Sequence, residues 1–289
     1  MKILNFLKLL PPYKVLIYIL VIIIFIFIIA PFVWLIISSI STKIELLSIP
    51  PHWIPHSPTL KNYKAILFGG VRTSKTIRYF KNALINSVII ASSVTIFCLI
   101  IGSMASYSLT RLKFRGRQPF FLLILTVQMV PAVSIIIPFY IVMMNFRLLD
   151  THLGLFITYC SFTLPFVIWI MMRYFQTIPV NLEDAARIDG CSRLGALVRV
   201  VLPLAAPGLA ATGIFAFIVA WNEFFFALIL TSINAKTLPV LVSEFSSKFG
   251  ADYLMMSTGG VLASIPPVVL ALVFQKFIIK GLTGGAVKG

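Results

Sequence analysis

A short run of charged and small residues stands out in a chain that is otherwise mostly apolar. Glu183 and Asp184 are followed by Ala185 and Ala186, and Gly190 comes four residues later. Acids favour the N-terminal end of a helix, alanine has the highest helix propensity, and glycine tolerates the backbone that ends a helix. The run therefore predicts a short helix with carboxylates and a small face that another protein could approach closely. This chemistry suits binding, not bond making.

A second helical piece is expected beyond the glycine. Pro179 can open the first helix, and the second runs through Leu194 to Val201 and up to Pro203. From these local residues alone, a solvated loop with ordinary caps explains the pattern as well as a partner-binding surface does, because acidic helix starts and glycine stops are common.

The composition of the chain indicates that the helices on either side of this polar run lie in a lipid bilayer. Of the 289 residues, 60% are hydrophobic and 11% are charged, and the mean hydropathy is +1.03. A soluble core of this size could not bury so much apolar surface. Residues 15–37 carry no charge and would form a helix of about 30 to 35 Å, enough to cross the hydrocarbon core. This length exceeds that of a signal-peptide apolar region, so we expect a retained first span.

Further spans are delimited by the places where charges stop. The gaps are Lys81 to Arg111, Arg117 to Arg147, Asp150 to Arg173, Pro207 to Thr231 and Asp252 to Lys276. Only Glu223 interrupts the fourth gap. The sequence therefore predicts an all-α integral membrane protein with six transmembrane helices. Its parts are an N-terminus at 1–14, the first helix at 15–37, a loop at 38–80, a five-helix core at 81–279 containing the polar loop 173–206, and a tail at 280–289.

Basic residues in short loops set the orientation. The 110–117 loop holds four cations and no acid, whereas the opposite 145–152 loop holds Arg147 against Asp150. The 110–117 loop is therefore predicted to be cytoplasmic, together with both termini and the polar loop. The longer 38–80 loop is then predicted to be extracytoplasmic. It is also basic, but charge in longer loops influences orientation less.

Several functional classes do not fit this sequence. The net charge of +16 is spread over both faces and flanks the spans, so attraction to lipid headgroups explains it better than nucleic-acid binding. Cys98, Cys160 and Cys191 have no spacing that suggests a disulfide or metal site, and all three histidines are expected outside the spans. The chain also lacks a phosphate-binding loop of the Gly-x-x-x-x-Gly-Lys-[Ser/Thr] type. ATP would have to bind elsewhere.

The order of residues resembles a known motif. In bacterial ATP-binding-cassette (ABC) importer permeases an acid and two alanines are followed by three residues, a glycine, nine residues and Ile-x-Leu-Pro. The stretch from Asp184 through Gly190 to Val200-Val201-Leu202-Pro203 matches that spacing. Asp184 stands where the family often has glutamate, and Val200 where it often has isoleucine.

Other stretches are similar to the carbohydrate branch, and to the MalG-like second permease of maltose-type systems. They are Trp221-Asn222-Glu223-Phe224, the Arg111 to Arg117 loop, the Pro203 to Pro207 entry into the fifth helix and the glycine-rich end from Lys280 to Gly289. The resemblance covers nearly the whole chain and is weakest in the 38–80 loop.

The resemblance implies the type I ABC importer permease fold in a bacterial inner membrane. It also implies that transport, ATP hydrolysis and sugar delivery are carried out by separate subunits. This chain would pair with a second permease and catalyse no covalent chemistry. Its polar loop would dock as a coupling helix on one of two ATPase subunits, which bind ATP and Mg, and an external solute-binding protein would deliver sugar. The expected ATPase-contacting residues are Glu183, Asp184, Ala185, Ala186, Asp189 and Gly190.

An acid inside a span is costly and usually faces a cavity or a partner. Glu223 is expected about 24 Å into the fifth helix, where a role in the translocation pathway is favoured over structural pairing. Trp221 could stack on a sugar, or be an ordinary interfacial or core aromatic. Asn222 completes this candidate pathway set, and it could equally bond between helices.

Other functions remain as alternatives. The coupling motif is shared with importers of amino acids, peptides or ions. A carrier driven by protons or sodium is less favoured, because Glu223 is the one titratable carboxylate expected in a span and no internal repeat is found. A scaffold without transport activity is the third alternative.

Overall fold

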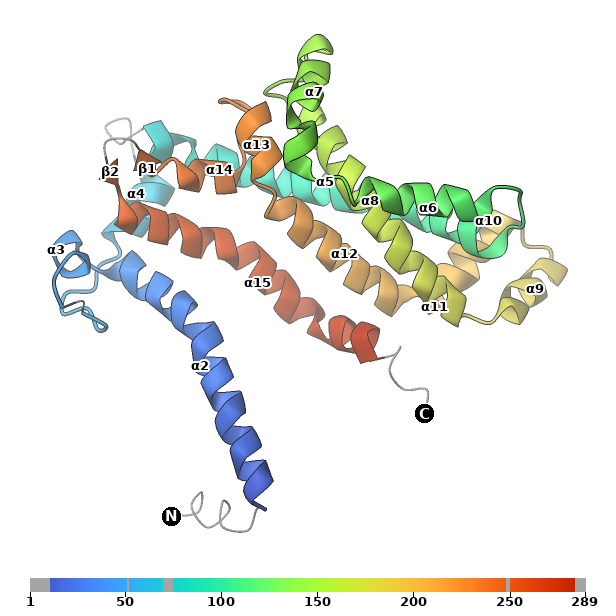
Figure 1. Ribbon diagram of the computed structural model, residues 1–289, viewed down its shortest axis with the longest axis horizontal. Helices are drawn as coiled ribbons and strands as arrows, with labels where there is room; N and C mark the ends of the chain where they lie inside the picture. The colour runs from blue at the N-terminus through green and yellow to red at the C-terminus, as the bar shows by residue number, and fades with distance from the viewer. Residues whose placement is uncertain (1–10, 51, 70–74, 248–249, 284–289) are drawn as a thin grey trace. The chain divides into compact units, whose positions relative to one another are not determined.

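The computed structural model describes residues 11–50, 52–69, 75–247 and 250–283 (Figure 1). Its elements in chain order are α2 (Pro12–Ile40), α3 (Lys43–Leu46), α4 (Lys61–Phe68), α5 (Lys75–Arg111), α6 (Arg117–Val127), α7 (Ala132–Asn145), α8 (His152–Thr177), α9 (Val180–Ile188), α10 (Arg193–Ala196), the π-helix η1 (Leu197–Val201), α11 (Leu202–Leu204), α12 (Ala206–Trp221), α13 (Phe225–Leu230), α14 (Leu238–Ser243), β1 (Ser246–Ser247), β2 (Gly250–Ala251) and α15 (Tyr253–Thr283). The predicted helical class is confirmed. The exception is the antiparallel pair β1–β2, which joins two residues on each strand.

Four helices are long and apolar enough to cross a membrane, and two bent helix pairs bring the number of candidate spans to six. The candidates formed by one helix lie in α2, α5, α8 and α15. The pair α6 and α7 bends by 93°, and the pair formed by α10 to α11 and α12 bends by 82°. The first bend falls just before Pro131, which has no N–H to continue the helix. Two of the six predicted spans are therefore broken and not continuous.

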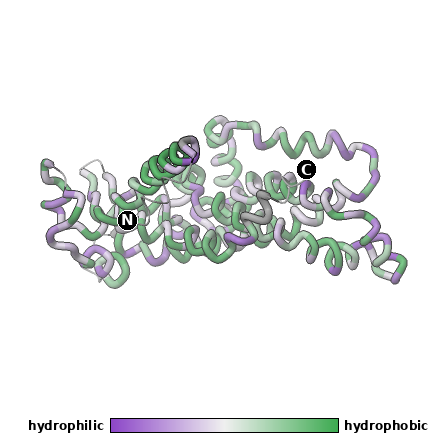
Figure 2. The backbone as a smooth tube through the Cα atoms, turned by 90° about the horizontal axis from the view of Figure 1, so that it is seen from below, coloured by the Kyte–Doolittle hydropathy of each residue, from purple (hydrophilic) through white to green (hydrophobic). Residues whose placement is uncertain are grey.

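The backbone coloured by hydropathy shows that the helices are mostly apolar and that polar residues lie mostly at the connections between them (Figure 2). His152, which was expected outside the spans, is the first residue of α8. The glycine-rich tail was expected to stop the last helix at about residue 280, but α15 continues to Thr283. The remainder of the tail and the first ten residues lie outside the described part of the chain.

The chain divides into two compact units, Met1–Arg78 with Val242–Leu262 and Tyr79–Leu241 with Ala263–Gly289. In the first unit, the end of α2 is tied to its neighbours by polar groups. Asn62 Nδ2 donates to the Ser39 carbonyl at 3.2 Å, and Thr258 Oγ1 donates to the same carbonyl at 3.4 Å. The most apolar stretch of α2 has no buried residue among those described, so this stretch, unlike the end of the helix at Ser38 and Ser39, leaves its side chains uncovered within the described chain.

The second unit is built around α8, whose apolar window is 56% buried. Val167, Met171 and Phe175 of α8 are fully enclosed. Gly208 lets α12 approach closely, because a Cβ there would lie 2.4 Å from the ring of Tyr174. This packing fixes the end of α8, from which the polar loop leaves.

Candidate functional site

The predicted polar helix is present as α9, and its glycine stop is confirmed. Gly190 has φ +89°, the left-handed backbone that glycine adopts without cost. The Cys191 N–H donates to the Ala186 carbonyl at 3.0 Å, and the Gly190 N–H donates to the Arg187 carbonyl at 3.1 Å. These two bonds form a Schellman motif, which satisfies carbonyls that the end of a helix leaves unpaired. Gly190 therefore sets the direction in which the chain leaves α9.

One face of α9 is directed away from the rest of its unit. Asp184, Ala185 and Asp189 are exposed, and the Ile188 side chain is 86% exposed. At 100° per residue, Ala185 lies on the side of the helix opposite Glu183. The exposed side of α9 therefore presents one isoleucine beside small and acidic residues.

Glu183 differs from the other predicted contact residues because it faces inward. Its side chain is 5% exposed and forms an ion pair with the Nε of Arg111, whose side chain is 9% exposed. A carboxylate buried in this way is not available to a partner. The sequence-based assignment of Glu183 to the contact surface is therefore replaced by an internal role.

Arg111 is the residue that sequence reasoning missed. It ends α5, and its second terminal nitrogen donates to the carbonyls of Phe175 at 2.9 Å and Ile178 at 2.7 Å. Both carbonyls belong to the last turn of α8 or the residue after it, where a helix runs short of N–H partners, and the Phe175 carbonyl also accepts the Ile178 N–H at 3.2 Å. One guanidinium thus joins the ends of α5 and α8 to α9. The signal in the sequence was a single arginine at the end of a long uncharged segment, which predicted a span boundary but not an ion pair with Glu183.

The chain returns to the membrane through a change of helix type. Ser192 Oγ accepts the Gly195 N–H at 3.1 Å and starts α10, as the predicted second helical piece requires. The motif residues Val200 and Val201 then lie in the π-helix η1, immediately before Leu202 and Pro203 of α11. π-Helical turns are rare and often occur at functional sites. The predicted helical piece beyond Gly190 is therefore confirmed. It contains a π-helical turn, η1, and is followed by the 82° bend before α12.

Glu223 is not inside a continuous helix. α12 ends at Trp221, and the Glu223 carboxylate accepts the N–H groups of Phe226 at 2.9 Å and Ala227 at 3.1 Å. These donors belong to the first turns of α13, where a helix has unpaired N–H groups and favours negative charge. The expected position deep in one helix is therefore wrong. A structural pairing, the less favoured alternative, accounts for this side chain.

Trp221 is a core residue and only 2% exposed. Its Nε1 donates to the Ala263 carbonyl at 3.1 Å, and its ring stacks on Phe217 with centroids 5.6 Å apart. Its face is therefore not open to a sugar in this conformation. Asn222 is exposed and follows the last residue of α12.

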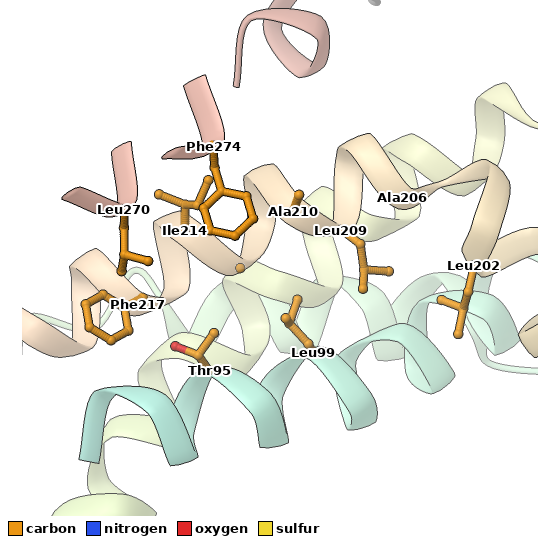
Figure 3. Close-up of a pocket in the computed structure, with 11 residues that line it drawn as sticks. Thr95, Leu99, Leu202, Ala206, Leu209, Ala210, Ile214, Phe217, Leu270 and Phe274 are labelled. Carbon is orange, nitrogen blue, oxygen red and sulfur yellow. The ribbon is translucent and has the colours of Figure 1, made fainter. Parts of the chain in front are cut away.

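A cavity of about 400 Å³ lies beside α12, and its lining is almost entirely carbon. Figure 3 shows Phe217, Leu270 and Phe274 on one side and Leu99 with Thr95 on the other. Sugars are held by several precisely placed polar groups. Among the described residues that line this cavity, Thr95 has the one polar side chain. The cavity walls therefore do not form a sugar site by themselves.

On the side of the chain where α7 ends, Asp150 holds a loop that the sequence did not predict. Its carboxylate accepts backbone N–H groups from Ser232, Ile233, Asn234 and Ala235 at 3.0 to 3.2 Å. Burial acts to raise the pKa of the Asp150 carboxyl, but these four donors outweigh it and hold the pKa below its usual value.

Asn86 secures the same loop from α5. Its Nδ2 donates to the carbonyls of Asn234 at 2.8 Å and Lys236 at 2.9 Å, and its Oδ1 lies 2.7 Å from His152 Nε2. The connection between α13 and α14 is therefore fastened to both α5 and the start of α8.

Comparisons with known proteins agree with this arrangement. Residues 98–284 match the family model described as the binding-protein-dependent transport system inner membrane component. The chain is 36% identical over 278 residues to a trehalose/maltose transport system permease protein from Thermococcus litoralis, covering 96% of this chain and 97% of that protein. It is 35% identical over 260 residues to a sulfoquinovosyl glycerol transport system permease protein from Agrobacterium fabrum, covering 90% and 88%.

A trehalose transport system permease protein from Mycobacterium tuberculosis is 37% identical over 262 residues, covering 90% of this chain and 92% of that protein. Among solved structures, a chain of a bacterial ABC transporter involved in the import of the acidic polysaccharide alginate matches with a TM-score of 0.76 and 24% identity, covering 91% of this chain and 95% of that chain. The structural match shows a shared fold.

Proposed function

The chain belongs to the family of binding-protein-dependent transport system inner membrane components, and from this premise we propose that it is a permease subunit of an ATP-driven sugar importer. The observation that carries the proposal is the outward face of α9, which combines exposed Ile188 with small and acidic residues. Such a face on a water-side helix suits a groove on another protein. We assign the groove to an ATPase subunit.

The proposed contact set is smaller than the sequence suggested. Asp184, Ala185, Ala186, Asp189 and Gly190 remain as the surface that meets the ATPase. Ala185 and Ala186 permit close approach, the acids provide charged contacts, and Gly190 sets the exit from the helix. Glu183 supports this surface from behind through Arg111.

The same ion pair suggests how force reaches the membrane. A displacement of α9 would act on Arg111, and through it on the ends of α5 and α8. Closure of two ATPase subunits would then move the permease pair as rigid bodies between inward-facing and outward-facing states, and ATP hydrolysis with Mg on the ATPase subunits would reset them. The chain itself is a transport subunit and supplies no bond-making step.

The partners in this proposal are a second permease, two ATP-binding subunits and an external solute-binding protein. A second permease would cover part of the apolar surface that α2 and the carbon-lined cavity beside α12 leave open within the described chain. The sugar cargo is proposed from the relatives named above, whose descriptions include trehalose, maltose and sulfoquinovosyl glycerol.

The test uses the complex of this chain with its partner subunits in lipid vesicles. Binding protein loaded with trehalose or maltose should stimulate ATP hydrolysis and drive labelled sugar inward, whereas methionine should do neither. Stimulation by an amino acid and not by any sugar would overturn the assignment of the cargo. Recovery of the tagged chain with no nucleotide-binding subunit would overturn the assignment as an importer.

A further inference from the structure

A polar cavity of about 270 Å³ lies between the α5–α6 turn and α9, in the region where Figure 1 shows these elements at one end of the second unit. Its lining includes five cationic residues, Arg111, Lys113, Arg117, Arg187 and Arg193. Two acids, Glu183 and Asp184, line it as well. The cavity wall therefore carries a formal charge of five minus two, or +3.

Most of this positive charge has no counterion within the described part of the chain. Glu183 pairs with Arg111 at the buried side of the cavity. The side chains of Lys113, Arg117, Arg187 and Arg193 form no ion pair within 4.0 Å among the described residues. Four cations thus surround one cavity against the single carboxylate of Asp184. An anion with several oxygens would satisfy them.

The position of the cavity indicates where this anion comes from. The candidate span in α5 ends at Arg111, and the next bent span begins at Arg117, so both cavity residues mark the ends of apolar segments. Span ends lie at the level of the lipid headgroups, where arginine and lysine direct their charges. The turn between them exposes Phe114, and α6 exposes Phe120 and Leu123. This apolar surface beside the cavity suits acyl chains.

We propose that this cavity binds the phosphate of an anionic lipid headgroup, with Lys113 and Arg117 as its membrane-side contacts and Arg187 and Arg193 as contacts from the loop of α9 and α10. A bound phosphate would connect the α5–α6 turn to the helix that faces the partner. The site goes beyond the proposed transport function, because its occupancy is measured without sugar or ATP.

The chain offers a matched control for this site. Arg115 lies in the same turn and is exposed, but it does not line the cavity. The variants Lys113→Gln/Arg117→Gln and Arg115→Gln remove charge while keeping a polar side chain. A cation near an anionic surface contributes a factor of about five in affinity, so the double variant should lose about 30-fold and Arg115→Gln much less.

The assay is a titration of the intact purified complex with phosphatidylglycerol and, separately, with phosphatidylcholine, followed by native mass spectrometry of bound lipid. The wild type and Arg115→Gln should retain phosphatidylglycerol in preference to phosphatidylcholine, and the double variant should lose that preference. Inorganic phosphate at millimolar concentration should not displace the lipid. Displacement would identify a soluble phosphate as the ligand in place of the lipid.

Two further results would overturn the proposal. Equal losses in the double variant and in Arg115→Gln would show general surface attraction without a site. Unchanged lipid binding together with release of an ATPase subunit from the double variant would show that an acidic segment of that subunit fills the cavity.

Discussion

Removing the carboxylate of Glu183 should weaken both the fold of the loop and its coupling to the spans. The side chains of Glu183 and Arg111 are 5% and 9% exposed, so Glu183→Ala leaves a guanidinium buried without its counterion. Breaking one partner of a buried pair typically costs about 3 to 5 kcal/mol. Arg111 keeps its bonds to the carbonyls of Phe175 and Ile178, so we place the loss near the lower end, at about 3 kcal/mol.

The prediction is checked on the purified complex by two measurements. The thermal unfolding midpoint should fall for Glu183→Ala, and amide hydrogen exchange should rise in residues 178–190 because α9 is no longer fastened. Sugar-stimulated ATP hydrolysis should fall more than basal hydrolysis. Asn181→Ala, at an exposed position of α9 outside the proposed contact set, is the control and should leave the midpoint unchanged.

A double variant separates the buried charge from the packing. Arg111→Met/Glu183→Leu removes both charges, so it should recover much of the midpoint that Glu183→Ala loses. It should still couple poorly, because the bonds to the end of α8 are also gone. An unchanged midpoint and unchanged exchange in Glu183→Ala would refute the role assigned to this pair.

Three further changes have defined outcomes. Gly190→Val places a β-branched residue at φ +89°, where an added Cβ meets nothing within 4 Å. The backbone strain alone should therefore lower the free energy of unfolding by about 1 to 2 kcal/mol or more, and sugar uptake should fall. Gly190→Asn should have a milder effect in the same uptake assay, because asparagine tolerates a positive φ better. Glu223→Gln keeps one acceptor oxygen and loses a charged cap of α13, so the unfolding midpoint should fall by an amount equivalent to about 1 to 2 kcal/mol; no change would argue against the capping role. Because the pKa of Asp150 is lowered on folding, its stabilisation is present above the ordinary value of about 4 and is lost only as the pH falls through the lowered value. Asp150→Asn should therefore lower the midpoint equally at pH 7 and pH 5, and an effect confined to pH 7 would contradict this.

The sequence was sufficient for features that depend on local residue types. Uncharged stretches located the spans, and the acids, alanines and Gly190 located α9 and its stop, because helix propensity and left-handed backbone are properties of single residues. The side of α9 that each residue occupies was not predicted. Glu183 and Asp184 are adjacent and equally charged, and only the place of Arg111 decides that the first is buried.

The broken helices were beyond sequence reasoning for a different reason. A helix does break at Pro131, but proline also lies inside α7, α8 and α15 without dividing them. Proline alone therefore does not predict which helices are broken. The interruption after Trp221 depends on Glu223 capping α13, a contact that hydropathy does not report. The fastening of the 232–235 loop likewise joins segments more than eighty residues apart.

The central claim is that the outward face of α9 meets an ATPase subunit, and co-purification of the tagged chain tests it most directly. Ala185 is exposed on the side opposite Glu183, so a bulky residue there fits the isolated chain but blocks a close partner. Wild type and Ala185→Ser should retain an ATPase subunit in mild detergent, and Ala185→Trp should lose it while keeping the second permease. Full retention of the ATPase subunit by Ala185→Trp would contradict the account.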